Sequence, residues 1–382
     1  MSMTLTDLRI VTPSEVHDGW LTVDDGRITR IGRGNRPHDG HSLGGRLVVP
    51  GFVDIHSHGG AGGSYPDGEP VTAAAVATFH LDRGTTTTLA SLVTAAPETL
   101  ARATAVLAEL CDQGVIAGIH FEGPYLAAKR CGAHDPALLR APDRAEFRSL
   151  LKAGRGHVRM ITIAPELPGA LDLIREAVAE GVVAAIGHTD ATYEQTIAGI
   201  EAGATVATHL FNAMPPLAHR SPGPIAALLQ DERVTVELIN DGVHVHPAVL
   251  RLAIARTGPG RTALVTDAMA AAGMGDGRYR LGPMDVEVSG GVARLVDGGA
   301  IAGSTLTMDA AFRRAVVDLG VSLVDAARMT ALTPARLLGL DDAIGSISIG
   351  KYADLVVLDD DLRVDGVMKR GTWVRPPSPR HG

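Results

Sequence analysis

The stretch that decides the fold reads VVPGFVDIHSHGG and covers residues 48–60. Its apolar run ends in two histidines, His56 and His58, and two glycines follow them. A short apolar run bounded by Pro and Gly is typical of a buried strand. Side chains alternate between the two faces of a strand, so His56 and His58 are expected to point to the same side. Such a pair can bind a metal ion from one strand, and Gly59 and Gly60 leave room above it.

The composition describes a globular chain with a large core. The chain has 382 residues, of which 45% are hydrophobic and 20% are charged, and its formal net charge is −8. That length and apolar content allow one large domain and a smaller one. The negative charge argues against a nucleic-acid partner, because phosphate backbones are bound by clustered Lys and Arg. A small anionic substrate needs only one or two local cations.

The compartment is predicted from the cysteines and the N-terminus. The only cysteines are Cys111 and Cys131, which do not suggest a disulfide framework, so we expect a cytoplasmic location. The first residues, MSMTLTDLRIVTPSE, lack the basic and apolar segments of a signal peptide. An uninterrupted apolar stretch of about 20 residues, as a bilayer span requires, does not occur, so no membrane association is expected.

The middle of the chain alternates short apolar strands with Ala- and Leu-rich segments of helical period. We predict helices over residues 69–84, 96–114, 169–181, 192–203 and 247–258. The eight predicted strands cover 48–58, 85–92, 115–123, 158–166, 182–190, 205–213, 234–241 and 262–269. This rhythm predicts an α/β fold with a (β/α)8 TIM-like barrel. The rival, an open doubly wound sheet, usually carries GxGxxG after its first strand, and this chain does not.

The two ends of the chain resemble each other. Both alternate β-prone runs with turns, so they are predicted to pair into one small discontinuous β-sandwich domain. The predicted domains are therefore 1–48 with 343–382 for the β domain, and 49–342 for the barrel. Residues 277–299 read as a β-hairpin excursion without a clear position, and 306–320 and 322–339 read as a helical pair.

Histidines and carboxylates gather where the predicted strands end. In a (β/α)8 barrel these ends share one rim, where active sites are built. One histidine at a strand end is more often ordinary hydrogen-bonded structure, but six ligand-type residues at five strand ends favour a metal site. The six are His56, His58, Glu122, His188, His209 and Asp267.

Asp267, in LVTDAM, has two possible roles. A carboxylate beside a metal-bound water can take its proton as general base, and the same group can then protonate a leaving amine. Alternatively Asp267 is one more metal ligand. The two roles are compatible.

The segment PGFVDIHSHG and the strand-end order HxH, Glu, His, His, Asp resemble the amidohydrolase superfamily. Five further motifs follow in one order: GIHFEGPYL, GHTDATYEQ, ATHLFNAMPPLAHRSPG, NDGVHVHP and VTDAMAAAG. Within the superfamily they resemble the deacetylases of N-acetylglucosamine 6-phosphate, and the resemblance covers nearly the whole chain. The strand 158–166 lacks the lysine that bridges two metals in many relatives, and Glu122 can supply the bridge instead.

The resemblance implies one or two divalent metal ions per subunit. Glu122, His188 and His209 would hold the main ion. His56 and His58 would hold a second one together with Glu122, and Asp267 is a candidate fourth ligand. Zinc is the default metal, and iron, manganese or cobalt are possible.

The resemblance also implies how a sugar phosphate would be bound. His134 would polarise the amide carbonyl or hold the sugar, with Ala133 beside it. Arg220 and His244 would bind the phosphate, and in the family this arginine comes from the other subunit of a homodimer. From the residues alone, Arg220 reads equally as a solvated charge on a Pro-rich loop. Further contacts are expected from Asn212, Ala213, Ile301 and Ala302.

The residues predict a metal-dependent hydrolase, and the resemblance implies that it deacetylates N-acetylglucosamine 6-phosphate to acetate and glucosamine 6-phosphate. Another amidohydrolase, acting on a cyclic amide or deaminating a small molecule, is the alternative. A non-catalytic barrel would be expected to have lost ligand residues, and all of them are present.

Overall fold

The chain is described by a computed structural model that covers residues 2–34 and 40–379. It divides into two compact units. One holds the described residues of Met1–Asp54, His80–Thr87 and Met308–Gly382, and the other holds Ile55–Phe79 and Thr88–Thr307. The domain boundaries expected from the sequence, at residues 48/49 and 342/343, stay a prediction.

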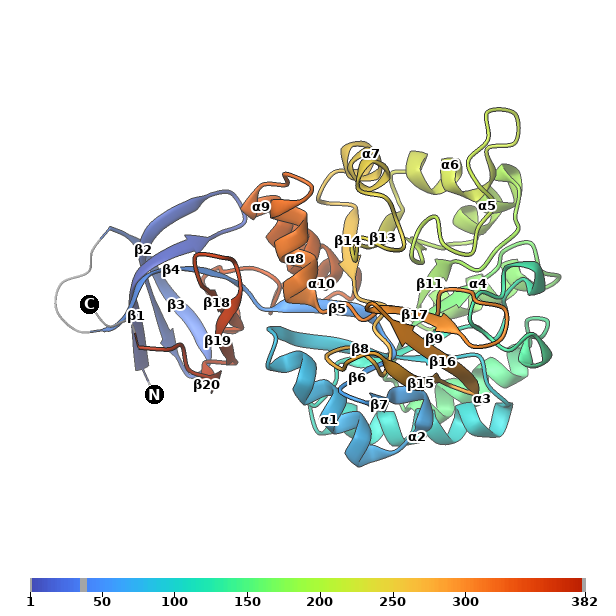
Figure 1. The fold of residues 1–382 in the computed structure, drawn as a ribbon, viewed down its shortest axis with the longest axis horizontal. Coiled ribbons are helices and arrows are strands. Elements are labelled where there is room, and N and C mark those ends of the chain that lie inside the picture. Colours follow the sequence, from blue (N-terminus) through green and yellow to red (C-terminus); the bar gives the residue numbers. More distant parts are fainter. Residues whose placement is uncertain (1, 35–39, 380–382) are drawn as a thin grey trace. The chain divides into compact units, whose positions relative to one another are not determined.

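Eight parallel strands form a nearly closed barrel (Figure 1). The two end strands of the sheet approach each other where the Asp267 amide donates to the carbonyl of His56 at 2.8 Å. The predicted (β/α)8 architecture is confirmed. The strands, in sheet order, are β5 (Phe52–Ser57), β8 (Thr85–Val93), β9 (Gly118–Glu122), β10 (Val158–Ile163), β11 (Val183–Ile186), β12 (Val206–Ala207), β13 (Thr235–Ile239) and β14 (Thr262–Val265).

Helices connect the barrel strands. The five predicted helices are present as α1 (Pro70–Leu81), α2 (Pro97–Asp112), α4 (Ala170–Ala179), α5 (Tyr193–Glu201) and α7 (Pro247–Thr257). The sequence analysis did not predict α3 (Arg144–Gly154) or α6 (Gly223–Gln230). Helix α3 has a clear start signal, because the Asp143 side chain accepts from the amides of Ala145 and Glu146. Three short 3₁₀ turns are η1 (Tyr65–Asp67), η2 (Ala128–Arg130) and η3 (Pro136–Leu138).

The predicted hairpin after β14 is an antiparallel sheet of three strands, β15 (Gly277–Leu281), β16 (Met284–Ser289) and β17 (Val292–Leu295). Its apolar face packs Val286 and Leu295 against Met269 and Ala302, so this excursion is anchored to the loops that follow β14. A small ribbon of β6 (Gly59–Gly60) and β7 (Gly63–Ser64) follows the histidine pair.

Strands from both termini form a second, seven-stranded sheet, as the sequence predicted for the small domain. They are hydrogen-bonded into one sheet, in which β1 and β4 are parallel. Its core includes Leu5, Ile10, Val48, Leu355 and Met368. In sheet order the strands are β20 (Thr372–Arg375), β19 (Val364–Lys369), β18 (Leu355–Leu358), β4 (His41–Pro50), β1 (Ser2–Val11), β2 (Val16–Asp24) and β3 (Arg27–Arg33).

The predicted helical pair near the C-terminus is present as several segments. They are α8 (Met308–Val317), α9 (Leu323–Ala327), a π-helical turn η4 (Arg328–Leu332) and α10 (Thr333–Leu337). Within the described part of the chain, every helix is too short or too polar to span a lipid bilayer.

The barrel interior beneath the strand ends is tightly packed around Gly187. A Cβ atom at this position would lie 2.6 Å from Cβ of Thr208 and 2.9 Å from Cγ2 of Thr162. Both threonines are fully buried, and their hydroxyls are hydrogen-bonded to each other at 2.9 Å. Glycine at 187 therefore permits the close approach of three strands directly before His188.

We predict that Gly187→Ala destabilises the protein by about 1–3 kcal/mol, the usual cost of overpacking a core. Gly260→Ala is the matched control, since a Cβ at that position meets nothing within 4 Å and its φ is not in the left-handed region. Denaturant unfolding midpoints of the two variants measure the difference. Equal midpoints would contradict the prediction, because they would show that the barrel interior accommodates a methyl group at residue 187.

Candidate active site

A cavity of about 260 Å³ lies at the carboxyl ends of the barrel strands. The loops that follow β9, β11, β12, β13 and β14 all contribute to it. Its lining consists of His58, Glu122, Gly132, Ala133, His134, His188, His209, Asn212, Ala213, His244, Asp267, Leu281, Ala300, Ile301 and Gly303. Polar and ionisable side chains from separate strands therefore converge on one space, as at the active face of a barrel enzyme.

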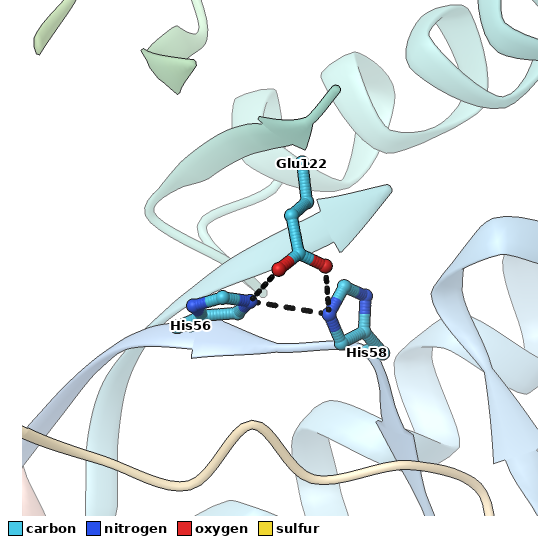
Figure 2. Close-up of side chains that lie close together, drawn as sticks. All are labelled: His56, His58 and Glu122. Carbon is cyan, nitrogen blue, oxygen red and sulfur yellow. Dashed lines mark hydrogen bonds and ion pairs between the residues drawn. The ribbon is translucent and has the colours of Figure 1, made fainter. Parts of the chain in front are cut away.

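The histidine pair at the end of β5, His56 within the strand and His58 just after it, faces Glu122 of β9 (Figure 2). The Nε2 atoms of His56 and His58 lie 3.2 Å apart, which agrees with the prediction that both side chains point to one side. His58 Nε2 lies 3.2 Å from Glu122 Oε2, and His56 Nε2 lies 3.5 Å from Glu122 Oε1. All three side chains are almost completely buried.

A second pair of imidazoles meets the same carboxylate. Glu122 Oε1 lies 3.0 Å from His188 Nε2 and 2.9 Å from His209 Nε2. These two nitrogens are themselves 3.0 Å apart. Asp267 lies beside the first pair, with Oδ1 3.2 Å from His58 Nε2. The structure thus brings all six predicted ligand residues together.

The donor set fits a divalent metal. Nitrogens on a tetrahedral zinc-like ion, at about 2.0–2.1 Å from the metal, are separated by roughly 3.3 Å. The Nε2 separations of 3.0 and 3.2 Å are close to that value. Two imidazole lone pairs directed at each other repel unless a proton or a cation lies between them. Buried His and Glu side chains in this arrangement therefore support a divalent metal site.

The outer nitrogens of three of the imidazoles have acceptors, which leaves Nε2 free to bind a metal. His58 Nδ1 lies 3.1 Å from the carbonyl oxygen of Ser91, and His188 Nδ1 lies 2.8 Å from that of Arg130. His56 differs, because its Nδ1 faces a carboxylate, Glu237 Oε2, at 3.0 Å. Each acceptor places the proton on Nδ1, which is the usual arrangement behind a metal-binding histidine.

Burial and charge shift the pKa values in opposite directions. Burial disfavours the imidazolium forms, but the surrounding carboxylates outweigh it, so the pKa of His56 lies well above its usual range and that of His58 rises to about 9. Burial would raise the pKa of Glu122, yet the charges of His56 and His188 hold it well below its usual value. Burial likewise opposes ionisation of Asp267, but His56 and His58 lower its pKa to about 2. The carboxylates are therefore ionised at neutral pH and attract positive charge.

Three of the converging residues have strained backbones. His188, His209 and Asp267 have φ values of 48°, 28° and 47°, in the left-handed region that non-glycine residues rarely adopt. Each directly follows or closely follows the end of a barrel strand. Such strain is concentrated at functional sites, where the surrounding structure holds the residue in place.

His134 reaches the cluster from the loop after β9. Its Nδ1 accepts a hydrogen bond from the Thr94 amide at 3.2 Å, so the ring proton is on Nε2. Nε2 lies 3.3 Å from Glu122 Oε2 and lines the cavity. Burial is the main cause that lowers the pKa of His134, to about 4, so the ring is a neutral donor at neutral pH.

The predicted phosphate ligands are placed differently from each other. His244 lines the cavity and its Nδ1 lies 2.6 Å from Asp241 Oδ2. Burial opposes protonation of His244, but the Asp241 carboxylate outweighs it and raises the pKa. Arg220 is exposed and does not line this cavity.

The predicted sugar contacts fall into two groups. Ala133, Asn212, Ala213 and Ile301 line the cavity, whereas Ala302 is fully buried in the core beneath β15–β17. The amide of Asn212 already donates to the His209 carbonyl at 3.1 Å.

Two further observations concern the same rim. Leu281 of β15 lines the cavity, and the Cys131 carbonyl accepts from the His134 amide at 3.0 Å.

The sequence analysis missed three polar residues around the cluster. Glu237 and His120 are fully buried on β13 and β9, and Asp241 pairs with His244. His120 Nδ1 lies 2.9 Å from Ser91 Oγ and its Nε2 lies 2.9 Å from Thr162 Oγ1, so it belongs to a polar layer below the predicted ligand residues. A charged residue in the apolar run VTVELI was a signal for Glu237, because carboxylates are seldom buried without a partner.

Comparison with known proteins agrees with this geometry. The sequence pattern of the amidohydrolase family matches residues 47–374, which is most of the chain.

The chain belongs to the amidohydrolase family.

Relatives of this amidohydrolase include two curated bacterial enzymes. An N-acetylgalactosamine-6-phosphate deacetylase of Escherichia coli is 40% identical, over 85% of this chain and 87% of the relative. An N-acetylglucosamine-6-phosphate deacetylase of Bacillus subtilis is 34% identical, over 97% of this chain and 96% of the relative.

A solved structure is similar over nearly the whole length of the amidohydrolase. It is a mutant N-acetyl-D-glucosamine-6-phosphate deacetylase of Mycobacterium smegmatis in complex with N-acetyl-D-glucosamine-6-phosphate. The identity is 50%, the TM-score is 0.95, and the match covers 98% of this chain and 100% of that one.

Proposed function

We propose that this amidohydrolase hydrolyses the acetamido group of N-acetylglucosamine 6-phosphate to give glucosamine 6-phosphate and acetate. The observation that carries the proposal is the joint placement, in one cavity, of a cluster that can bind a metal, a carboxylate, and His244 with its Asp241 partner. The relatives named above support the substrate class. Because one of them acts on the galactosamine epimer at 40% identity, N-acetylgalactosamine 6-phosphate is the second candidate substrate.

The metal ligands are proposed in two groups that share Glu122. His188 and His209 complete the main site, and His56 and His58 complete the other, with Asp267 as a neighbouring ligand. We propose zinc, which imidazole and carboxylate ligands suit, with iron, manganese or cobalt as alternatives. A divalent ion bound here supplies a Lewis acid that polarises the amide carbonyl and lowers the pKa of water.

Asp267 is proposed to move the proton. Its low pKa keeps it ionised, so it can accept a proton from the attacking water. A carbon–oxygen bond to the acetyl carbon forms, and the carbon–nitrogen bond then breaks. Asp267 returns the proton to the sugar nitrogen, which leaves as an amine.

His134 is proposed to stabilise the negative charge that develops on the acetyl oxygen. Its neutral ring carries the proton on Nε2, which faces the cavity. A donor that is fixed in this way before the substrate binds costs little reorganisation during the reaction. The Thr94 amide holds the ring in the tautomer that this role requires.

The phosphate is proposed to bind His244 and Arg220. Asp241 favours the imidazolium form of His244, whose Nε2 remains available to a dianion. Arg220 is exposed and outside this cavity, so we propose that it serves the neighbouring subunit of a homodimer. The cytoplasmic location expected from the sequence stays a prediction.

For Asp267→Asn, we predict that kcat for acetate release falls by roughly 10²–10⁴-fold, the usual contribution of general acid–base catalysis. Substrate binding, measured by calorimetry, should change far less. Asp172→Asn is the matched control, because Asp172 is an exposed residue of α4. An Asp267→Asn enzyme that keeps its metal and more than a tenth of the original kcat would refute the proposed proton transfer.

Acetate release from a panel of N-acetylated sugars, each with and without the 6-phosphate, tests the proposed function directly. Metal-stripped protein should be inactive, and reloading should restore activity toward the N-acetylhexosamine 6-phosphates. Arg220→Ala and His244→Ala should each raise KM for the phosphorylated sugar roughly 10- to 100-fold, as expected for a lost charge-assisted hydrogen bond. The unphosphorylated sugar should be unaffected.

The same variants test the proposed dimer. Mixing Arg220→Ala with Asp267→Asn subunits should restore activity, because one site of the mixed dimer then has both residues. An unchanged KM in both cation variants would instead favour a hydrolase of cyclic amides or a deaminase.

A further inference from the structure

Glu237 is a fully buried carboxylate that the proposed chemistry does not use. It lies in the middle of β13, and its Oε2 accepts two hydrogen bonds. One comes from the ring of His56 at 3.0 Å and the other from the backbone amide of His209 at 3.1 Å. Its other oxygen, Oε1, has no hydrogen-bond partner within the described structure.

A buried carboxylate in this position is costly unless nearby positive charge compensates it. Its ion-pair partner in the described structure is an imidazole, His56, and not a Lys or Arg side chain. Its charge is therefore directed through the ring of His56 toward the cluster. Together with Glu122 and Asp267, it makes the interior of the barrel mouth strongly attractive to cations.

His56 differs from the other proposed ligand histidines in the group that its ring Nδ1 faces. His58 and His188 face neutral backbone carbonyl groups, and His209 Nδ1 has no partner in the described residues. An ionised carboxylate behind an imidazole makes the ring a stronger ligand and fixes its orientation and tautomer. The side chain of Glu237 therefore faces only a ligand ring of the position that His56 shares with His58, and it contacts the other group through the backbone amide of His209.

Resting on the proposed function, we propose that Glu237 is a positioning residue that sets the affinity of the His56/His58 metal position. It holds His56 with the proton on Nδ1, so that Nε2 faces Glu122 and His58. The hydrogen bond that it accepts from the His209 backbone amide fixes the position of the carboxylate. The same bond ties Glu237 to the strained backbone of a ligand in the other group.

Glu237→Gln separates charge from shape. The glutamine oxygen can still accept hydrogen bonds, but the negative charge behind His56 is gone. We predict a loss of metal affinity of about 10- to 100-fold at the His56/His58 position, the usual effect of removing such a partner. Affinity at the Glu122, His188 and His209 position should change by less than about threefold.

Stepwise titration of metal-stripped full-length protein with Zn²⁺, in competition with a chromophoric chelator, measures both affinities. Co²⁺ absorption spectra report the geometry of each position independently of activity. Glu176→Gln is the matched control, since Glu176 is also a buried glutamate but pairs with Arg144 and Arg148 on the outside of the barrel. In a His56→Gln background, Glu237→Gln should have no further effect on Zn²⁺ binding.

The outcomes are distinct. Equal affinities in wild type and Glu237→Gln, or equal losses at both positions, would overturn the inference while leaving the proposed function intact. If the wild-type protein binds a single ion and the His188→Gln variant loses it, the inference is likewise overturned and the proposed function stays intact. A wild-type protein that takes up no ion would refute the proposed function itself. Glu237→Asp keeps the negative charge but places it one methylene further from His56. This variant should lower the Zn²⁺ affinity of the His56/His58 position alone, and it replaces Glu237→Gln if the glutamine variant does not fold.

Discussion

The rest of the site depends on the carboxylate of Glu122. It lies within 3.5 Å of five imidazole Nε2 atoms. One belongs to His134 on the loop after β9, and the other four belong to the predicted ligand histidines at the end of β5 and on the loops after β11 and β12. These nitrogens cannot approach so closely as neutral rings with opposed lone pairs. The fold therefore builds an arrangement that is complete only with positive charge at its centre, and a divalent metal supplies that charge in the ligand chemistry present.

Several features of the barrel follow from this requirement. Positive φ values turn His188, His209 and Asp267 back toward the mouth, and Gly187 lets the strands beneath them pack closely. The surroundings also give similar side chains different pKa values. His134 is kept neutral chiefly by burial, beside His56 and His58, whose pKa values are raised, and the Thr94 amide fixes its tautomer. One set of imidazoles can thus offer both metal ligands and a proton donor.

Much of this was predictable because strand ends are local signals. Apolar runs that stop at His or an acidic residue located the barrel strands and the six predicted ligand residues, which the structure brings together. The charged residue in the apolar run VTVELI signalled that Glu237 has a partner, but only the barrel geometry shows that Glu237 and His120, both in mid-strand, face His56. Helix α3 begins at a capping aspartate, Asp143, whereas α6 begins after Pro222 without a side-chain cap, so only α3 carries a clear local start signal. The hairpin at 277–299 was recognised, but its position depends on long-range packing against Met269.

The most direct test of the account is a crystal of the zinc-loaded protein, measured on both sides of the zinc absorption edge. We predict an anomalous peak between Glu122 and the Nε2 atoms of His188 and His209, and a second one beside His56 and His58. A difference map without a peak within bonding distance of these side chains would contradict the claim that the fold gathers them around a metal.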